Sequence, residues 1–278
     1  MHGLGNDFVV IDARERPLSV AVAGACALAD RHTGVGFDQL IIVEPPSDSR
    51  ANAFMRIRNA DGGEVSACGN AARCVARLLF EEGAQSDVVL ETAAGLITAH
   101  QVVDGAQHYT VDMGPARDGW QDIPVARECD TDHLPLALGP LSDPVGVNVG
   151  NPHAVFFVAD ADAVPLDQLG PPLEHDPLFP ERANISAAQI IDPATLRLRV
   201  WERGVGLTQA CGTGACAAAV AAHRRGLTGR AVQVRLDGGE LDIEWLVDGH
   251  VTMSGPASVS FTGAFDDAVL AAMDQSVG

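Results

Sequence analysis

The sequence contains one short pattern twice, as Ser66-Ala67-Cys68-Gly69-Asn70-Ala71 and as Gln209-Ala210-Cys211-Gly212-Thr213-Gly214. Each copy leads into an alanine-rich run, which predicts helices over 71–80 and 215–225. Each cysteine is therefore expected at a helix N-terminus, where unpaired backbone N–H groups and the helix dipole favour a thiolate and can hold an anion. Two thiols in equivalent settings indicate a pair that works on one substrate.

The second half of the chain repeats the first. Cys68 and Cys211 lie 143 positions apart, and the same offset places Arg56 on Arg199 and Gly95 on Gly238. Self-similarity at a steady offset predicts two copies of one supersecondary unit. A pseudo-two-fold axis between the copies would bring the two cysteine turns to a shared cleft.

The predicted strands and helices indicate an α/β (α+β) protein in which each half wraps strands around its own helix. A third helix is expected over about 18–31, a connection over 115–144, and a proline-rich loop with short helical turns over about 163–183. Apolar runs bounded by turn residues predict strands over 8–11, 39–43, 54–58, 88–91, 96–102, 109–113, 145–149, 154–158, 186–191, 196–201, 232–236, 241–245 and 251–253.

Composition narrows the classes of function. The net charge of −19 argues against nucleic acid and anionic membranes as partners, because a phosphate-binding surface needs a basic patch. All 18 basic residues are arginine. The absence of lysine argues against a Schiff base to pyridoxal phosphate and excludes a Walker-type phosphate loop. No apolar run reaches membrane-spanning length and no signal segment opens the chain, so we expect a soluble cytoplasmic protein that uses no cofactor.

Paired thiols at helix N-termini suit the inversion of an α-carbon. Backbone N–H groups of Gly69, Asn70, Gly212 and Thr213 could hold a small carboxylate between the two helices. A thiolate on one face could then remove the α-proton while a thiol on the other face returns one. Cysteine suits both roles because its ordinary pKa is near neutrality and a helix N-terminus lowers it.

Other interpretations of the cysteines stay open at this point. Cys68 and Cys211 could form a disulfide, or both could be buried structural thiols, which are common. A zinc site built from Cys68, Cys74, Cys211 and Cys216 is disfavoured by spacings longer than those of usual ligand knuckles. Cys74, Cys216 and Cys26 fall inside predicted helices and are expected in the core.

Longer motifs resemble the diaminopimelate epimerase family over nearly the whole chain. They are His2-Gly3-Leu4-Gly5-Asn6-Asp7-Phe8, Gly34-Val35-Gly36-Phe37-Asp38-Gln39, Asn59-Ala60-Asp61-Gly62, Cys68-Gly69-Asn70 with Arg73-Cys74, Gly150-Asn151-Pro152-His153, Trp201-Glu202-Arg203-Gly204 and Ala210-Cys211-Gly212-Thr213-Gly214. The resemblance implies two domains of like fold, each a mixed β barrel or sheet around a central helix. The domains would be 1–114 with 257–278, carrying Cys68, and 115–256, carrying Cys211.

The same resemblance implies a homodimeric cytoplasmic isomerase. It would convert LL-2,6-diaminopimelate into the meso form without a cofactor or metal, in lysine and peptidoglycan precursor synthesis. Cys68 and Cys211 would be the base and the acid, assisted by His153 and Glu202. The substrate would be bound by Asn6, Gln39, Asn59, Gly69, Asn70, Asn151, Asn184, Arg203, Gly212 and Thr213.

Two alternative functions remain open from the residues alone. One is a proline or hydroxyproline racemase with the same pair of cysteines. Its smaller substrate has no distal carboxylate, so it would not need Arg203, whose guanidinium can bind such a group bidentately. The other is a non-catalytic amino-acid-binding or redox-switch protein, which would bind its ligand without exchanging the α-proton.

Overall fold

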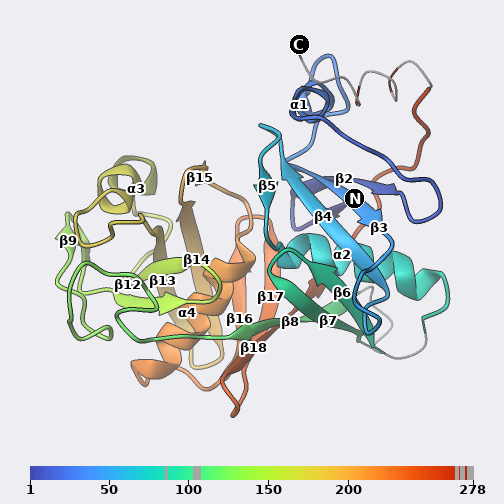
Figure 1. The fold of residues 1–278 in the computed structure, drawn as a ribbon. Helices are drawn as coiled ribbons and strands as arrows, with labels where there is room; N and C mark the ends of the chain where they lie inside the picture. Colours follow the sequence, from blue (N-terminus) through green and yellow to red (C-terminus); the bar gives the residue numbers. More distant parts are fainter. Residues whose placement is uncertain (85–86, 103–107, 267–268, 270–272, 274–278) are drawn as a thin grey trace. The chain divides into compact units, whose positions relative to one another are not determined.

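The computed structural model of the chain describes residues 1–84, 87–102, 108–266, 269 and 273. The chain forms two compact units. One consists of Met1–Val111 together with Gly255–Gly278, and the other of Asp112–Ser254 (Figure 1). Of the predicted segment 257–278, residues 267–268, 270–272 and 274–278 lie outside the described part. No helix in the described ranges is long and apolar enough to cross a membrane.

The first unit is a mixed sheet with two helices. Its strands are β1 (His2–Gly3), β2 (Asn6–Asp12), β3 (Gln39–Glu44), β4 (Ala53–Asn59), β5 (Glu64–Val65), β6 (Val88–Thr92), β7 (Gly95–Gln101) and β8 (His108–Pro115). Its helices are α1 (Val22–Ala29) and α2 (Gly69–Glu81). The strands lie in the order β1-β2-β3-β4-β6-β7-β8, and β5 forms a hairpin with β4. The β2–β3 and β4–β6 pairs are parallel.

The second unit also has mixed strand pairing. Its strands are β9 (Ala137–Leu138), β10 (Leu141–Ser142), β11 (Val145–Asn148), β12 (Pro152–Phe157), β13 (Asn184–Asp192), β14 (Thr195–Glu202), β15 (Gly206–Leu207), β16 (Ala231–Leu236), β17 (Gly239–Trp245) and β18 (His250–Pro256). Its helices are α3 (Leu166–Glu174) and α4 (Gly212–Arg224). The order is β18-β17-β16-β14-β13-β12-β11, with β15 on β14 and a separate β9–β10 ribbon.

The pairing pattern of the first unit recurs in the second, as the sequence repeat predicts. β12–β13 and β14–β16 are the parallel pairs that correspond to β2–β3 and β4–β6. The β14–β15 hairpin corresponds to β4–β5, and both hairpins lead into the helix that carries a cysteine motif. The α/β fold class inferred from the sequence is thereby confirmed.

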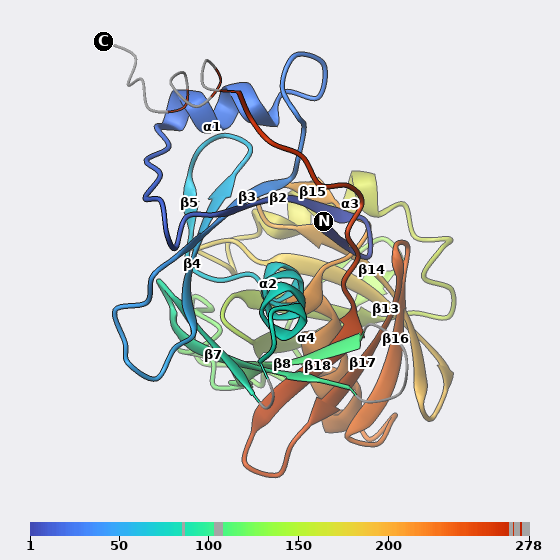
Figure 2. The same ribbon diagram turned by 90° about the vertical axis from the view of Figure 1, so that its right-hand side faces the viewer.

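The cysteine helices are the central helices of their units. Helix α2 contacts β1, β2, β6 and β7, and Figure 2 shows it among the strands of its own unit. Helix α4 contacts β11, β12, β13, β14, β16 and β17. All residues from Gly214 to Ala222 are buried, because their small side chains allow strands to approach from every direction. Such a helix holds its N-terminal residues in a fixed place.

The predicted helix over 18–31 is shorter in the structure, where α1 spans only Val22–Ala29. It buries one face, formed by Gly24, Ala25, Leu28 and Ala29. Cys26 lies on the other face and is exposed, so its assignment to the core was wrong. Cys74 and Cys216 are buried, as predicted.

Two stretches, one predicted as a connection and the other as a proline-rich loop, contribute to the core of the second unit. Residues 115–144 supply Ile123, Leu134 and Leu141, which are fully or almost fully buried, and form the β9–β10 ribbon. Within 163–183, the short helical turns expected there are a single helix, α3, which continues through Pro171 and Pro172. Its Leu166 and Leu173 pack into the same cluster. This burial outweighs the helix hydrogen bonds that the two prolines cannot donate.

Candidate active site

Cys68 is the N-cap residue of α2 and has an extended backbone, with φ −150° and ψ 112°. Its carbonyl accepts the first hydrogen bond of the helix from Ala72 N, at 2.9 Å. The N–H groups of Gly69 and Asn70 therefore lie in the first turn of the helix, where the helix dipole favours a nearby anion. The helix begins two residues earlier than predicted, so both residues lie within it. The Cys68 side chain is half-buried.

A chain of hydrogen bonds fixes Asn70 and Asn6 beside this helix end. Buried Arg73 donates from Nη2 to Asn70 Oδ1 at 3.0 Å, and Asn70 Nδ2 donates to Asn6 Oδ1 at 3.2 Å. Asn6 Nδ2 then donates to Asp38 Oδ2 at 2.9 Å. A guanidinium only donates and a carboxylate only accepts, so the two ends set the orientation of both amides.

Gln39 and Asn59 occupy the same end of the first sheet. They are directly opposite each other on β3 and β4, and Gln39 Nε2 donates to Asn59 Oδ1 at 2.9 Å. Gln39 Oε1 is buried and has no hydrogen-bond partner among the described residues. A buried acceptor without a partner costs free energy, and a ligand ammonium group could satisfy it.

Cys211 is the N-cap residue of α4 and is buried, with 3% of its surface exposed. Its sulfur accepts a hydrogen bond from Gly214 N at 3.4 Å and lies 3.6 Å from Thr213 Oγ1. The thiol also donates to the Glu202 carboxylate, which in turn accepts from the Thr208 hydroxyl.

The surroundings of Cys211 raise the pKa of its thiol well above the ordinary value. Burial is the largest cause, and the negative charge of Glu202 adds to it. The hydrogen bonds from Thr213 and Gly214 act in the opposite direction but do not prevail. The expectation that a helix N-terminus lowers the pKa is thus wrong for Cys211, which is held as a thiol.

His153 is wholly buried on β12, opposite Asn184 on β13. Its Nε2 lies 2.8 Å from Asn151 Oδ1, an atom that only accepts, so the proton of the neutral ring is placed on Nε2. Burial, with the nearby charge of Arg203, lowers the pKa of His153 to about 3. Within the described ranges, the ring therefore donates to Asn151, whereas Asn184 Nδ2, 3.4 Å from Nε2, donates to Pro152 O.

Arg203 and Asn184 belong to the same cluster. Asn184 Oδ1 accepts from the backbone N–H of Arg203 at 2.8 Å, while its Nδ2 donates to Pro152 O at 2.9 Å. The Arg203 guanidinium donates to Glu181 O at 2.9 Å and is only partly buried. It keeps further donors for a carboxylate ligand.

Each unit therefore supplies one thiol at a helix N-terminus and a polar cluster next to it. Asn6, Gln39, Asn59, Gly69 and Asn70 lie in the unit of Cys68. The unit of Cys211 contains Asn151, His153, Asn184, Glu202, Arg203, Gly212 and Thr213.

Sequence reasoning missed the residues that hold these clusters. Arg73 stands inside the first cysteine motif, but nothing in the motif indicates that its side chain is buried against Asn70. Asp38 lies in a quoted motif without an assigned role. No signal in the sequence points to Thr208 or to Glu174. Glu174 accepts hydrogen bonds from Trp201 and Gly204.

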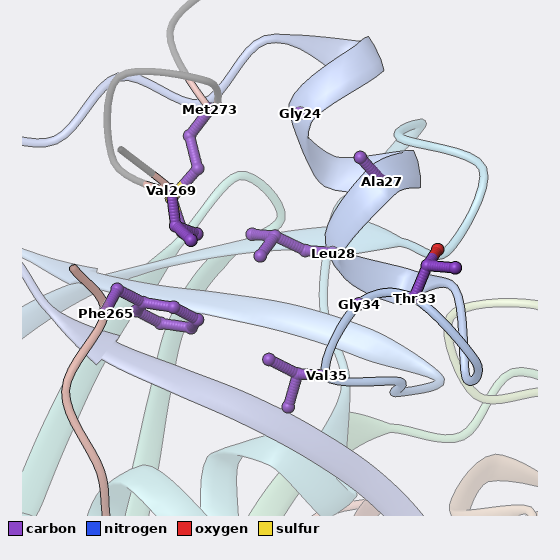
Figure 3. A pocket seen from close by; sticks show the side chains of 9 residues that line it. All are labelled: Gly24, Ala27, Leu28, Thr33, Gly34, Val35, Phe265, Val269 and Met273. Carbon is purple, nitrogen blue, oxygen red and sulfur yellow. The ribbon is translucent and has the colours of Figure 1, made fainter. Parts of the chain in front are cut away.

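A cavity of about 370 Å³ lies elsewhere in the first unit, between α1 and residues near the chain end (Figure 3). It is lined by Gly24, Ala27, Leu28, Thr33, Gly34, Val35, Phe265, Val269 and Met273. None of the predicted site residues lines it, and nearly all of its side chains are apolar. It does not suit a zwitterionic amino acid, whose charged groups need polar partners.

Comparison with known proteins agrees with the motifs. The family model described as "Diaminopimelate epimerase" matches residues 1–118 and 145–260. A diaminopimelate epimerase of Rhodospirillum centenum is 56% identical over 270 residues, which cover 97% of this chain and 92% of that protein. One from Erythrobacter litoralis is 58% identical over 267 residues, with 96% of each chain covered.

Solved structures share the fold at low identity. A predicted epimerase from Pseudomonas aeruginosa has a TM-score of 0.65 at 20% identity and covers 93% of this chain and 94% of its own. A hydroxyproline epimerase from Agrobacterium vitis, solved with trans-4-hydroxy-L-proline, has a TM-score of 0.64 at 19% identity, covering 92% and 86%. The fold is thus common to several isomerases, whereas the family model and the curated relatives are specific. The chain belongs to the diaminopimelate epimerase family.

Proposed function

We propose that this protein is a diaminopimelate epimerase, an isomerase that interconverts LL- and meso-2,6-diaminopimelate in lysine and peptidoglycan precursor biosynthesis. The activity is that of curated relatives 56% and 58% identical over nearly the full chain. The structural observation that carries the proposal is the repeated arrangement of Cys68 and Cys211, each the N-cap residue of the central helix of its unit.

The proposed reaction needs only the two thiols. One thiolate removes the α-proton, the C–H bond breaks, and the electron pair stays on the α-carbon. The other thiol then delivers a proton to the opposite face, so the configuration inverts and the charge has moved from one sulfur to the other. The roles exchange in the reverse direction. No external base, oxidant or cofactor is required.

The N–H groups of the two helix first turns would hold the α-carboxylate. Gly69 and Asn70 supply them from α2, and Gly212 and Thr213 from α4. These donors would also stabilise the negative charge that develops as the α-proton leaves. We further propose that Cys211 is the protonated partner in the resting enzyme. Its burial and the neighbouring Glu202 carboxylate both support this assignment.

The remaining polar groups would select the substrate. Diaminopimelate carries two carboxylates and two ammonium groups. The Arg203 guanidinium can bind the distal carboxylate, and buried Gln39 Oε1 can accept from an ammonium group. Asn6, Asn59, Asn151 and Asn184 complete the proposed binding set. Proline has no second carboxylate, so this set favours diaminopimelate over the cyclic substrate of the racemase alternative.

The decisive experiment follows the α-proton. The reduced protein is incubated with LL-diaminopimelate in deuterated water, and the products are separated by chiral chromatography and mass spectrometry. We expect the meso form with one deuterium at the inverted carbon, and no exchange with L-proline. Absence of exchange from the natively folded, reduced protein would refute the proposal.

Cysteine variants test the two-base assignment against a matched control. Cys68→Ala and Cys211→Ala should each abolish epimerisation, whereas Cys26→Ala, the same change at an exposed thiol, should leave it intact. Full activity in either of the first two variants would contradict the assignment. As part of the same proposal, the enzyme is cytoplasmic and forms a homodimer. Light scattering after size exclusion would test the homodimer by giving its molar mass.

A further inference from the structure

Glu174 is a buried carboxylate outside the sequence motifs. It is the last residue of α3 and only 3% of its surface is exposed. Its Oε2 accepts from the indole N–H of Trp201 at 2.7 Å, and its Oε1 accepts from Gly204 N at 3.0 Å. Arg182 Nη1 lies 3.3 Å from the same Oε1. A buried carboxylate needs such donors, and here two of them belong to one short segment.

The same helix holds Trp201 by its ring. Gly170 precedes Glu174 by one helical turn, so both lie on one face of α3. A Cβ atom at Gly170 would stand only 2.4 Å from Trp201 Cγ, which means that the glycine backbone lies directly against the indole. Helix α3 thus contacts Trp201 twice. Gly170 packs against the indole ring, and Glu174 accepts a hydrogen bond from the indole N–H.

The segment held in this way carries two proposed active-site residues. Trp201 is fixed through its indole, Arg203 N is held by Asn184 Oδ1, and Gly204 N by Glu174. Glu202, which contacts the Cys211 thiol, lies between these anchored positions. A shift of the segment would move Glu202 and Arg203 together.

We propose that Glu174 is a positioning residue, which fixes the Trp201–Gly204 segment so that Glu202 meets Cys211 and Arg203 meets the substrate. The inference rests on the proposed function of those residues. A carboxylate is needed because both of its oxygens accept. Glutamine has almost the same shape, but its NH₂ group would face either the indole N–H or the Gly204 N–H, leaving two donors opposed.

The central variant is therefore Glu174→Gln. We expect kcat/KM for LL-diaminopimelate to fall roughly 10- to 100-fold, with KM raised and kcat lowered, because misplacing reacting groups is costly. Glu174→Asp keeps both acceptors and should recover part of the loss. Arg182→Gln, which removes only an exposed partner of the carboxylate, should stay within about twofold of wild type.

Two readouts do not depend on turnover. The indole N–H cross-peak of Trp201, assigned with Trp201→Phe, should move in the NMR spectrum of Glu174→Gln. The pH midpoint for alkylation of Cys211, followed by mass spectrometry, should fall by about one unit, because a displaced Glu202 no longer opposes the thiolate. Circular dichroism reports whether the variant is folded.

The outcomes separate the two proposals. Lack of turnover by the wild type contradicts the proposed function, and the alkylation midpoint then still tests Glu174. Wild-type turnover with unchanged kinetics and an unchanged midpoint in folded Glu174→Gln overturns the positioning role alone. If that variant does not fold, Glu174→Asp and Trp201→Phe replace it, and wild-type kinetics together with an unchanged Cys211 midpoint in both would overturn the role.

Discussion

Arg73 donates a hydrogen bond to the side-chain oxygen of Asn70 inside the first unit, three residues along the helix that begins after Cys68. The hydrogen bonds continue in one direction from Asn70 to Asn6 and from Asn6 to Asp38. A buried cation at one end and a carboxylate at the other thus orient two amides next to a proposed catalytic thiol. The orientation follows from charge rather than from shape, and it can be tested from both ends.

Replacing Arg73 by methionine should lower kcat/KM, although Arg73 is not itself a proposed substrate-binding residue. The variant removes the donor that fixes Asn70 and leaves Asn70 Oδ1 buried without it. We expect kcat/KM to fall by roughly 10-fold or more, since losing a buried hydrogen bond to a charged group costs about 1.5–3 kcal/mol. Steady-state kinetics with circular dichroism measure this.

Arg77→Met is the matched control. Arg77 lies one turn later on α2 and donates to Ala257 O, but it contacts none of the proposed site residues through that bond. The Arg77→Met variant should have a lower free energy of unfolding without a comparable change in KM. Equal kinetic effects in the two variants would show that Arg73 only stabilises the fold.

Replacing Asp38 by alanine tests the other end of the chain. Without the carboxylate, the amide of Asn6 can turn over, so KM should rise by about 5-fold, equivalent to about 1 kcal/mol. Asp48→Ala, at a half-buried aspartate paired with the exposed Arg50, should leave KM unchanged. An unaltered KM in Asp38→Ala would mean that Asp38 does not orient Asn6.

The thiol of Cys211 should become more reactive when Glu202 is neutralised. Glu202 raises the pKa of Cys211 by disfavouring the negatively charged thiolate, so Glu202→Gln should lower it. Alkylation by iodoacetamide, followed by mass spectrometry from pH 6 to 10, should therefore begin at a lower pH in the variant. The exposed Cys26 in the same digest is the internal control. A midpoint that stays in place or rises would contradict the assigned contact.

Buried His153 should make the folded protein sensitive to acid. Its pKa is about 3 in the folded state against 6.5 for the unperturbed group, so between these values only the unfolded chain binds the extra proton. The associated stability is fully present above pH 6.5 and is lost as the pH falls towards 3. The slope from this one group is at most about 1.4 kcal/mol per pH unit.

Denaturant unfolding between pH 7 and pH 4 measures this contribution. His153→Gln should show a shallower dependence of the free energy of unfolding on pH, and exposed His32→Gln should keep the wild-type dependence. Identical slopes in His153→Gln and the wild type would rule out this histidine as the source.

Much of the fold follows from local patterns in the sequence. The alternation in 54–58 predicts β4, and the alanine-rich runs after Cys68 and Cys211 predict α2 and α4. Helix α3 could not be predicted, because Gly170, Pro171 and Pro172 all disfavour a helix on their own. What stabilises it is the packing of Leu166 and Leu173 in the core and of Gly170 against Trp201, which only the folded chain supplies.

The candidate site, like the fold, could be predicted only in part from local sequence. Cysteine followed by glycine and a helix predicts where each thiol lies, but the ionisation of Cys211 depends on how deeply it is buried and on Glu202. That carboxylate lies nine positions earlier, on the strand that enters the β14–β15 hairpin, and no spacing rule connects the two. Electrostatic surroundings arise from residues brought together by tertiary structure, so the direction of the pKa change was not available from the motif.

The grouping of Gly255–Gly278 with Met1–Val111 has a consequence for synthesis on the ribosome. Arg73 and Arg77 of α2 bond to the carbonyls of Pro256 and Ala257, and His2 pairs with Ser258. These partners emerge only after all of Asp112–Ser254 has been translated. The unit of Cys68 therefore cannot complete the packing around α2 until Pro256, Ala257 and Ser258 have been synthesised. Helix α2, whose N-cap is Cys68, thus reaches its final contacts only after the whole of the second unit has been made.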